Sequence, residues 1–129
     1  MEAALRIRLL NAAPVANIVG SRINWGARPQ GEAYPSIVLT LVGGARPQSF
    51  KGFIDSRFTG VQIDCYGVSA AQVASLREAV ISAIVPAVTV SGVIFDRAFV
   101  DTVRNLNSHS ETGVVYRDSI DARFWHRSE

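Results

Sequence analysis

The sequence predicts a single α+β domain. In it, an antiparallel sheet of about four to five strands carries two main helices on one face, and a long hairpin loop projects. Three observations predict this class. The chain has 129 residues, a length that one hydrophobic core accommodates. Apolar residues recur at helical spacing in two segments and alternate with polar residues in others. In chain order, the predicted elements of this domain, residues 1–129, read α, β, β, β, α, β, β.

The first part of the chain predicts one helix followed by short elements. The helix is expected over residues 2–12, where leucines share one stripe. A short second helical turn is expected over residues 15–19, and Gly20 ends it. Residues 22–26 can form a brief strand. Residues 27–35 contain two prolines and a glycine, so they predict a loop or an edge segment.

Two strands and a long connection are predicted next. Residues 36–42 are rich in β-branched side chains, and residues 58–66 alternate apolar with polar ones, which predicts an antiparallel pair. The connection over residues 45–57 is too long for a tight turn and combines basic with aromatic side chains, a composition typical of a contact loop. The alternative is a hairpin tip whose aromatic side chains fold back onto the sheet. The expected contact residues are Arg46, Phe50, Lys51, Phe53 and Arg57.

The second main helix has the clearest signal in the sequence. Ser69 begins a capping box, and apolar residues at helical spacing continue from it to Ile84. Two long strands then complete the sheet. The first begins at residue 90 or 93 and ends at residue 106, and the second covers residues 113–127, where apolar and polar side chains alternate. Residues 107–111 are expected to join these strands.

Composition excludes several classes of protein. Only 19% of the residues are charged, which suggests that part of the surface faces another protein. The alternative is a compact monomer with an uncharged polar surface. The net charge is +2 and the arginines are scattered, so no clustered nucleic-acid footprint is visible. No apolar run reaches the roughly 18 residues of a membrane span. We therefore expect a soluble, cytoplasmic protein.

The residues that could be catalytic are more simply explained by structural roles. His109 lies between two serines in a predicted hairpin connection, and His126 fits a sheet-edge or interface position. Asp64 and Asp121 could form a carboxylate pair across strands, but no nucleophile or metal ligand accompanies them. Cys65 lies on the apolar side of its strand and is expected to be an inert core thiol. We expect no catalytic residue, cofactor or metal, and a protein that is not an enzyme.

Three segments in fixed order carry a resemblance to a known family. The first is RINWGARPQG (residues 22–31), followed by the strand over residues 37–41. The second is VQIDCY (residues 61–66), directly before the capped helix. The third combines YRDSID (residues 116–121) with FWHR (residues 124–127). Together they resemble the tail-completion, or tail-terminator, family of long-tailed bacteriophages, prophages and gene transfer agents.

The resemblance implies a structural role in a virion. Such proteins form a ring, typically a hexamer, at the head-proximal end of a tail tube, where they stop tube growth. The implied partners are further copies of the chain, the tail tube protein and a head-side stopper or connector, while DNA passes transiently and without sequence specificity. The protein would be made in the bacterial cytoplasm and act at the head–tail junction, with no membrane contact.

The resemblance also indicates which interfaces to expect. By position and residue type, the contact loop would face the tail tube or a neighbouring subunit. Subunit packing is expected to involve Arg28, Gln30, Trp125 and Arg127. Two alternatives remain: another connector ring protein (a stopper or adaptor), and a small ligand-binding or enzymatic α+β domain, which would need a pocket with convergent polar groups.

Overall fold

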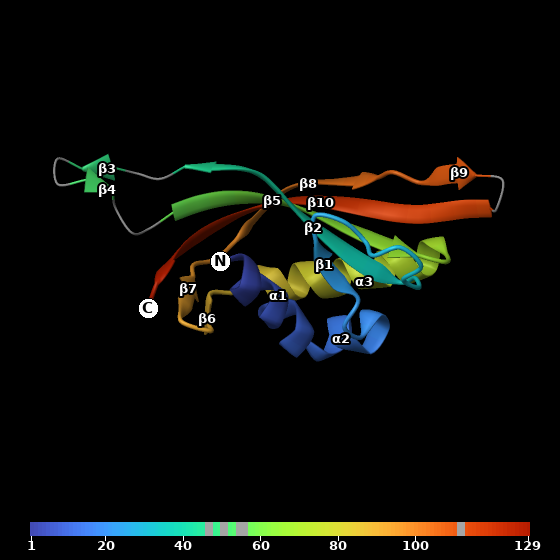
Figure 1. Ribbon diagram of the computed structural model, residues 1–129, viewed down its shortest axis with the longest axis horizontal. Coiled ribbons are helices and arrows are strands. Elements are labelled where there is room, and N and C mark those ends of the chain that lie inside the picture. The colour runs from blue at the N-terminus through green and yellow to red at the C-terminus, as the bar shows by residue number, and fades with distance from the viewer. Residues whose placement is uncertain (46–47, 50–51, 54–56, 111–112) are drawn as a thin grey trace.

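The computed structural model describes residues 1–45, 48–49, 52–53, 57–110 and 113–129 (Figure 1). Its helices are α1 (Glu2–Asn11), α2 (Ala13–Val19) and α3 (Ala70–Ile84). Its strands are β1 (Ile23–Trp25), β2 (Ser36–Ala45), β3 (Gln48–Ser49), β4 (Gly52–Phe53), β5 (Arg57–Gly67), β6 (Val88–Val90), β7 (Val93–Phe95), β8 (Phe99–Asn105), β9 (Ser108–Ser110) and β10 (Gly113–Ser128). No helix among these residues combines the length and the hydrophobicity that a membrane crossing requires.

Strand β10 organises the main sheet, because both of its edges are paired along most of their length. One edge pairs antiparallel with β5 between residues 116 and 126. The other edge pairs in succession with β9, β8 and β7. β2 pairs antiparallel with β5, and β1 pairs parallel with β2. The main path through the sheet is therefore β1-β2-β5-β10-β7-β6, with β8 and β9 also on β10.

The sheet is larger than the sequence predicted. In place of four to five antiparallel strands and two main helices, the described residues form an eight-stranded mixed sheet and three helices. The expected strand ending at residue 106 is interrupted near Ala98, whose N–H donates to the carbonyl of Val85 at the end of α3. β1, β6 and β9 each have three residues, which is too short for a clear alternation in the sequence.

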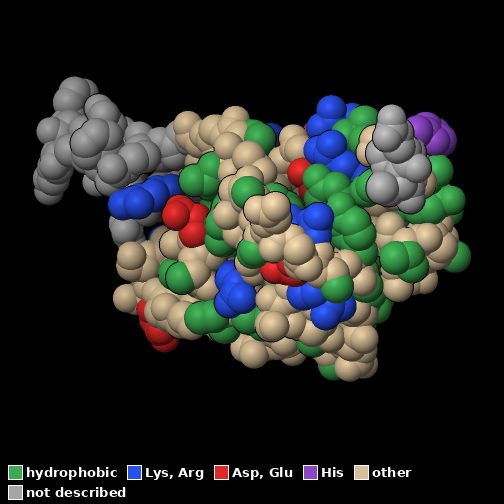
Figure 2. All heavy atoms as spheres, turned by 45° about the vertical axis from the view of Figure 1, so that its right-hand side comes forward, with side chains coloured by type: hydrophobic (Ala, Val, Ile, Leu, Met, Phe, Trp, Pro, Cys, Tyr) green, Lys and Arg blue, Asp and Glu red, His purple; other side chains and the backbone are tan. Residues whose placement is uncertain are grey.

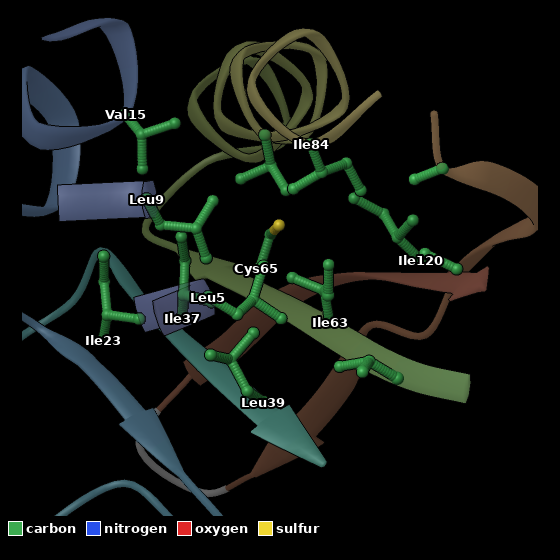
Figure 3. Close-up of a cluster of buried hydrophobic side chains, with 14 of the residues drawn as sticks. Leu5, Leu9, Val15, Ile23, Ile37, Leu39, Ile63, Cys65, Ile84 and Ile120 are labelled. Atoms are coloured by element: carbon green, nitrogen blue, oxygen red, sulfur yellow. The ribbon is translucent and has the colours of Figure 1, made fainter. Parts of the chain in front are cut away.

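All three helices lie on one face of the main sheet (Figure 1). The apolar stripe of α3, Val73, Leu76, Val80 and Ile84, is at most 1% exposed and packs against that face. The alternation predicted for the two central strands is confirmed, because Val61, Ile63 and Cys65 in β5 and Ile120, Ala122 and Phe124 in β10 are buried. Figure 3 shows these strands and the helices contributing side chains to one core.

The predicted start of α3 is confirmed in atomic detail. The Ser69 hydroxyl accepts a hydrogen bond from the backbone N–H of Gln72 at 3.1 Å, which satisfies one of the free donors of the first turn. The Gln72 side chain in turn accepts from the backbone N–H of Val68 at 2.9 Å. The helix ends at Ile84, two residues before Pro86, as expected.

A small hairpin separates β2 from β5. β3 and β4 pair with each other rather than with the main sheet, with Gln48 opposite Phe53 and Ser49 opposite Gly52. Figure 1 shows this ladder beyond one end of the main sheet, where the sequence predicted a projecting hairpin. We refer to β3 and β4 as the hairpin arm.

Candidate functional site

The face of the main sheet opposite the helices is a candidate contact surface. Along β10, even-numbered side chains such as Phe124 enter the core, so odd-numbered ones point to the opposite face. The register places Arg117 beside Tyr66, Asp121 beside Gln62 and Trp125 beside Phe58 on that face. We call it the open face, because no helix among the described residues covers it (Figure 1).

Arginine and aspartate side chains are matched along β10 and its neighbours. Four ion pairs have shortest N–O distances between 2.8 and 3.3 Å: Arg117 with Asp64, Arg104 with Asp121, Arg123 with Asp101, and Arg127 with Asp96. On the side of the molecule shown in Figure 2, basic side chains are likewise dispersed among acidic and hydrophobic ones. Because nearby carboxylates balance these charges, the open face is a poor site for tight phosphate binding.

An aromatic cluster lies at one end of the open face. The rings of Phe58 and Trp125 are 5.4 Å apart between centroids. The guanidinium of Arg123 lies over two rings, 5.7 Å from the centroid of Phe58 and 5.5 Å from that of Phe99. Phe99 is 52% exposed and Trp125 is 36% exposed, so the cluster presents apolar surface to its surroundings. Aromatic and arginine side chains of this kind are enriched in protein interfaces.

A stack of tyrosine and arginine side chains occupies the other end of the open face. The guanidinium of Arg28 lies 4.4 Å from the ring centroid of Tyr34, which stacks on Tyr66 at 5.8 Å, and Arg117 lies 5.6 Å from Tyr66. Burial raises the pKa of the Tyr66 hydroxyl, and the charge of Arg117 opposes that rise. The hydroxyl is therefore protonated at neutral pH. We call these four residues the tyrosine stack.

The structure places the four residues predicted for subunit packing in two separate regions. Trp125 belongs to the aromatic cluster, and Arg127 lies two residues further along β10. Arg28 belongs to the tyrosine stack, and Gln30 is exposed in the same connection between β1 and β2. Phe58 and Tyr66 are eight residues apart in β5, so the two regions are separated by about 26 Å. The open face thus has two chemically different ends.

Of the residues predicted for the contact loop, only two lie in described parts of the chain. Phe53 belongs to β4 of the hairpin arm. Arg57 is exposed at the start of β5 and lines a cleft of 310 Å³ with Met1 and His126, on the helix side of the sheet. Arg46, Phe50 and Lys51 lie outside the described residues.

The residues considered for catalysis are not brought into one site. His109 is exposed in β9, whereas His126 is buried and its Nε2 lies 2.8 Å from the Thr59 hydroxyl. Asp64 and Asp121 are each held by a different arginine. Cys65 is buried, and burial, followed by the nearby aspartates, raises the pKa of its thiol. The described residues contain no group of three metal-binding side chains.

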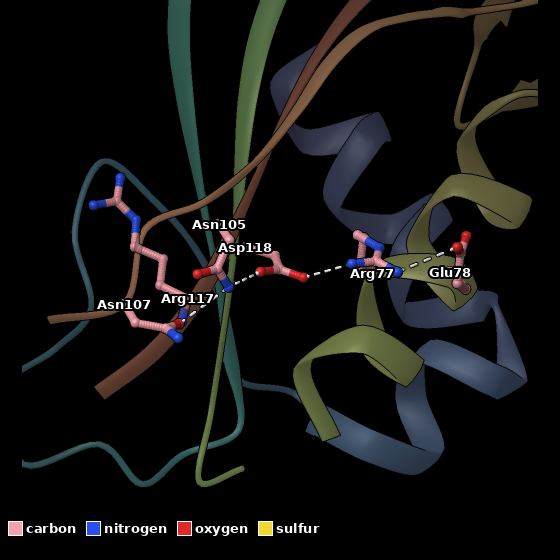
Figure 4. Close-up of polar contacts among 6 residues, drawn as sticks. All are labelled: Arg77, Glu78, Asn105, Asn107, Arg117 and Asp118. Atoms are coloured by element: carbon pink, nitrogen blue, oxygen red, sulfur yellow. Dashed lines mark hydrogen bonds and ion pairs between the residues drawn. The ribbon is translucent and has the colours of Figure 1, made fainter. Parts of the chain in front are cut away.

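A polar network on the helix side was not predicted from the sequence. Asp118 is buried and accepts hydrogen bonds from Arg77 of α3 and Asn105 of β8, both at 2.8 Å (Figure 4). Asn105 and Asn107 are also hydrogen-bonded to each other. The network borders a 340 Å³ cleft between α3 and β8. Arg77 is 41 residues from Asp118, so spacing gives no signal for this contact.

Comparison with known proteins identifies the family. The tail completion protein gp17 family matches residues 3–126. Among solved structures, the fold is similar to that of a chain from the virion of a native gene transfer agent particle. The TM-score is 0.70 at 18% sequence identity, and the match covers 99% of this chain and 95% of the other. No curated protein matches the sequence. Because the family match extends over nearly the whole chain, the protein belongs to the tail completion protein gp17 family and is a structural component of a phage-like tail.

Proposed function

We propose that the protein forms a ring at the head-proximal end of a tail tube, where it stops tube growth and joins the tail to the head-side connector. Its family membership is the observation that carries this proposal. The role is structural rather than enzymatic, and six copies is the stoichiometry that the resemblance implies. DNA passes through the ring without being bound tightly.

The two ends of the open face support a ring rather than a symmetric dimer. A closed ring of identical chains needs two different surfaces on each chain, which meet between neighbours. The aromatic cluster and the tyrosine stack differ in chemistry and lie about 26 Å apart along β5. We propose that Trp125 and Arg127 of one copy approach Arg28 and Gln30 of the next.

The hairpin arm is the proposed contact with the tail tube. It pairs only with itself within the described residues, so it is not required to complete the main sheet. The basic residues Arg46 and Lys51 and the aromatic residues Phe50 and Phe53 belong to this segment in the sequence. Replacing both Arg46 and Lys51 with Glu is expected to lower binding to purified tail tubes in a sedimentation assay, and unchanged binding would remove the arm from the contact.

The decisive experiment for the function is deletion of the reading frame in its source, followed by electron microscopy of the particles. Filled heads without tails, together with free tails of uncontrolled length, are expected. Normal joined particles would contradict the proposal. Complementation with the unaltered gene restores joined particles if the phenotype comes from this protein alone.

The interface can be tested in the same strain. Complementation with Trp125→Ala is expected to leave tails unjoined, because a buried aromatic side chain dominates many interfaces. Val68→Ala is the control, since Val68 is 65% exposed and belongs to neither the aromatic cluster nor the tyrosine stack. Equal rescue by the two variants would exclude Trp125 from the interface.

A further inference from the structure

Arg8 of α1 is buried at the carboxyl end of α3. The residue is only 6% exposed, and its Nε donates to the carbonyl of Ala83 at 3.0 Å. One terminal nitrogen, Nη2, donates to the carbonyl of Pro86, and the guanidinium lies 5.4 Å from the ring centroid of Phe95. The last carbonyls of a helix lack partners within it and carry partial negative charge, so Arg8 caps α3.

This capping leaves the guanidinium without a counter-ion. Its hydrogen-bond acceptors are neutral carbonyls, and none of the ion pairs among the described residues includes Arg8. The other terminal nitrogen, Nη1, is shielded from solvent and has no hydrogen-bond partner among the described residues. Leaving a buried donor unsatisfied is unfavourable, and more so when the group is charged. A negatively charged acceptor would recover that cost.

A cleft of 540 Å³ reaches this arginine between α1, the end of α3 and the β6 strand. Its volume lies within the range of small-ligand sites. Ile7, Val88 and Val90 provide apolar walls, while Asn11 and Thr89 provide polar groups. Among the described residues, Arg8 is the only charged side chain in the lining of this cleft, and no acidic residue lines it.

We propose that this cleft binds a carboxylate carried on an apolar segment of another polypeptide. A single guanidinium matches one monoanion, and a carboxylate oxygen is the charged acceptor that Nη1 lacks. A phosphate dianion would need a second positive charge, which the lining does not contain. The cleft is larger than a bare carboxylate, and its walls are apolar. The polypeptide that carries the carboxylate therefore contributes apolar contacts. This inference does not depend on the proposed ring.

The test compares two blocked peptides that differ only in charge, acetyl-Leu-Glu-Leu-amide and acetyl-Leu-Gln-Leu-amide. Binding is followed by the backbone amide resonances of Asn11 and Thr89 in nuclear magnetic resonance titrations of the whole protein. The Glu peptide is expected to bind in the millimolar range and about tenfold more tightly than the Gln peptide. Equal binding of the two peptides would overturn the proposal.

Substitutions on α1 test whether Arg8 causes the preference for the Glu peptide over the Gln peptide. Arg8→Met is expected to remove the difference between the peptides. Arg6→Met is the control, because it makes the same charge change on the same helix, where Arg6 Nε donates to the carbonyl of Ile23 at 2.7 Å. A preference for the Glu peptide that persists in Arg8→Met would overturn the proposal.

Two further measurements remain informative if Arg8→Met does not fold. In the unaltered protein, the side-chain Nε resonance of Arg8 is expected to shift with the Glu peptide and not with the Gln peptide, and absence of a shift would overturn the proposal. Sodium acetate is titrated separately at constant ionic strength. Binding of acetate as tight as that of the Glu peptide would mean that the site takes small free carboxylates, which would also overturn the assignment to a polypeptide.

Discussion

The two faces of the main sheet are made by the same strands but satisfy different requirements. On the helix side, Ile63, Ile120 and Phe124 are completely buried by the chain itself. On the open face, the alternate positions carry ion-paired arginines and the partly exposed side chains of Phe99 and Trp125. The comparison teaches that alternate residues of one strand have different roles. Those on the helix side stabilise the fold, and those on the open face are available for contact with other chains. Substitutions on the two faces are therefore expected to have different consequences.

The largest expected effect comes from truncating the core. Phe124→Ala removes a buried ring that packs edge-to-face against Phe95, with 6.1 Å between centroids. The expected loss in free energy of unfolding is about 3–5 kcal/mol, measured by urea denaturation. Phe99→Ala is the matched control on the open face, where the residue is 52% exposed, and its expected loss is below about 1 kcal/mol. Similar losses of unfolding free energy in the two variants would contradict the proposed difference between the faces.

An intermediate effect is expected from the ion pairs within the open face. The side chain of Asp64 is 5% exposed and accepts from both Arg117 and Gln62, whereas that of Asp121 is 31% exposed. Asp64→Ala is therefore expected to cost about 2 kcal/mol of unfolding free energy. Asp121→Ala is expected to cost less than about 1 kcal/mol, since solvent screens the pair with Arg104. Equal costs would show that burial does not distinguish the two aspartates.

A smaller effect on stability is expected from Trp125→Ala. The indole packs at a tilt against the ring of Phe58, but Trp125 is 36% exposed, so the isolated protein should lose about 1 kcal/mol. The measurement is thermal unfolding of the purified variant, made alongside the particle assay described above. A variant that unfolds at room temperature would assign Trp125 to the stability of the single chain rather than to assembly.

The smallest effect is expected at Cys65, where native protein should not react with a thiol reagent such as iodoacetamide at pH 8. The thiol is buried, and burial raises its pKa, so the folded state contains almost no thiolate. Unfolding in urea should restore the reactivity of an ordinary cysteine. Rapid labelling of the folded chain, measured by mass spectrometry, would show that the core around Cys65 opens.

Sequence reasoning succeeds here where one local rule decides the structure. The capping box at Ser69 and the alternation around Phe124 depend on neighbours within a few residues, and both were predicted correctly. The number of strands depends on distant contacts. The Ala98 N–H donates to the Val85 carbonyl between β7 and β8, and this contact with the end of α3 is not visible from the residues next to Ala98 in the sequence.

The same limit applies to the candidate surfaces. Trp125 was a recognisable contact candidate by residue type, but its neighbour Phe58 is 67 residues away and follows only from the register of β5 and β10. Arg8 was not singled out, because its acceptors at Ala83 and Pro86 lie 75 and 78 residues further along the chain. Long-range pairing of this kind requires the folded structure.

The length of β10 has a consequence for how the family can evolve. The strand has 16 residues, and its side chains alternate between two incompatible surroundings. Inserting or deleting one residue near its middle would move Arg123 toward the core and Phe124 toward the open face. Natural relatives are therefore expected to differ in length at the connections between β2 and β5 and between β9 and β10. Within β10 they are expected to differ by point substitutions, which leave every side chain on its original face of the sheet.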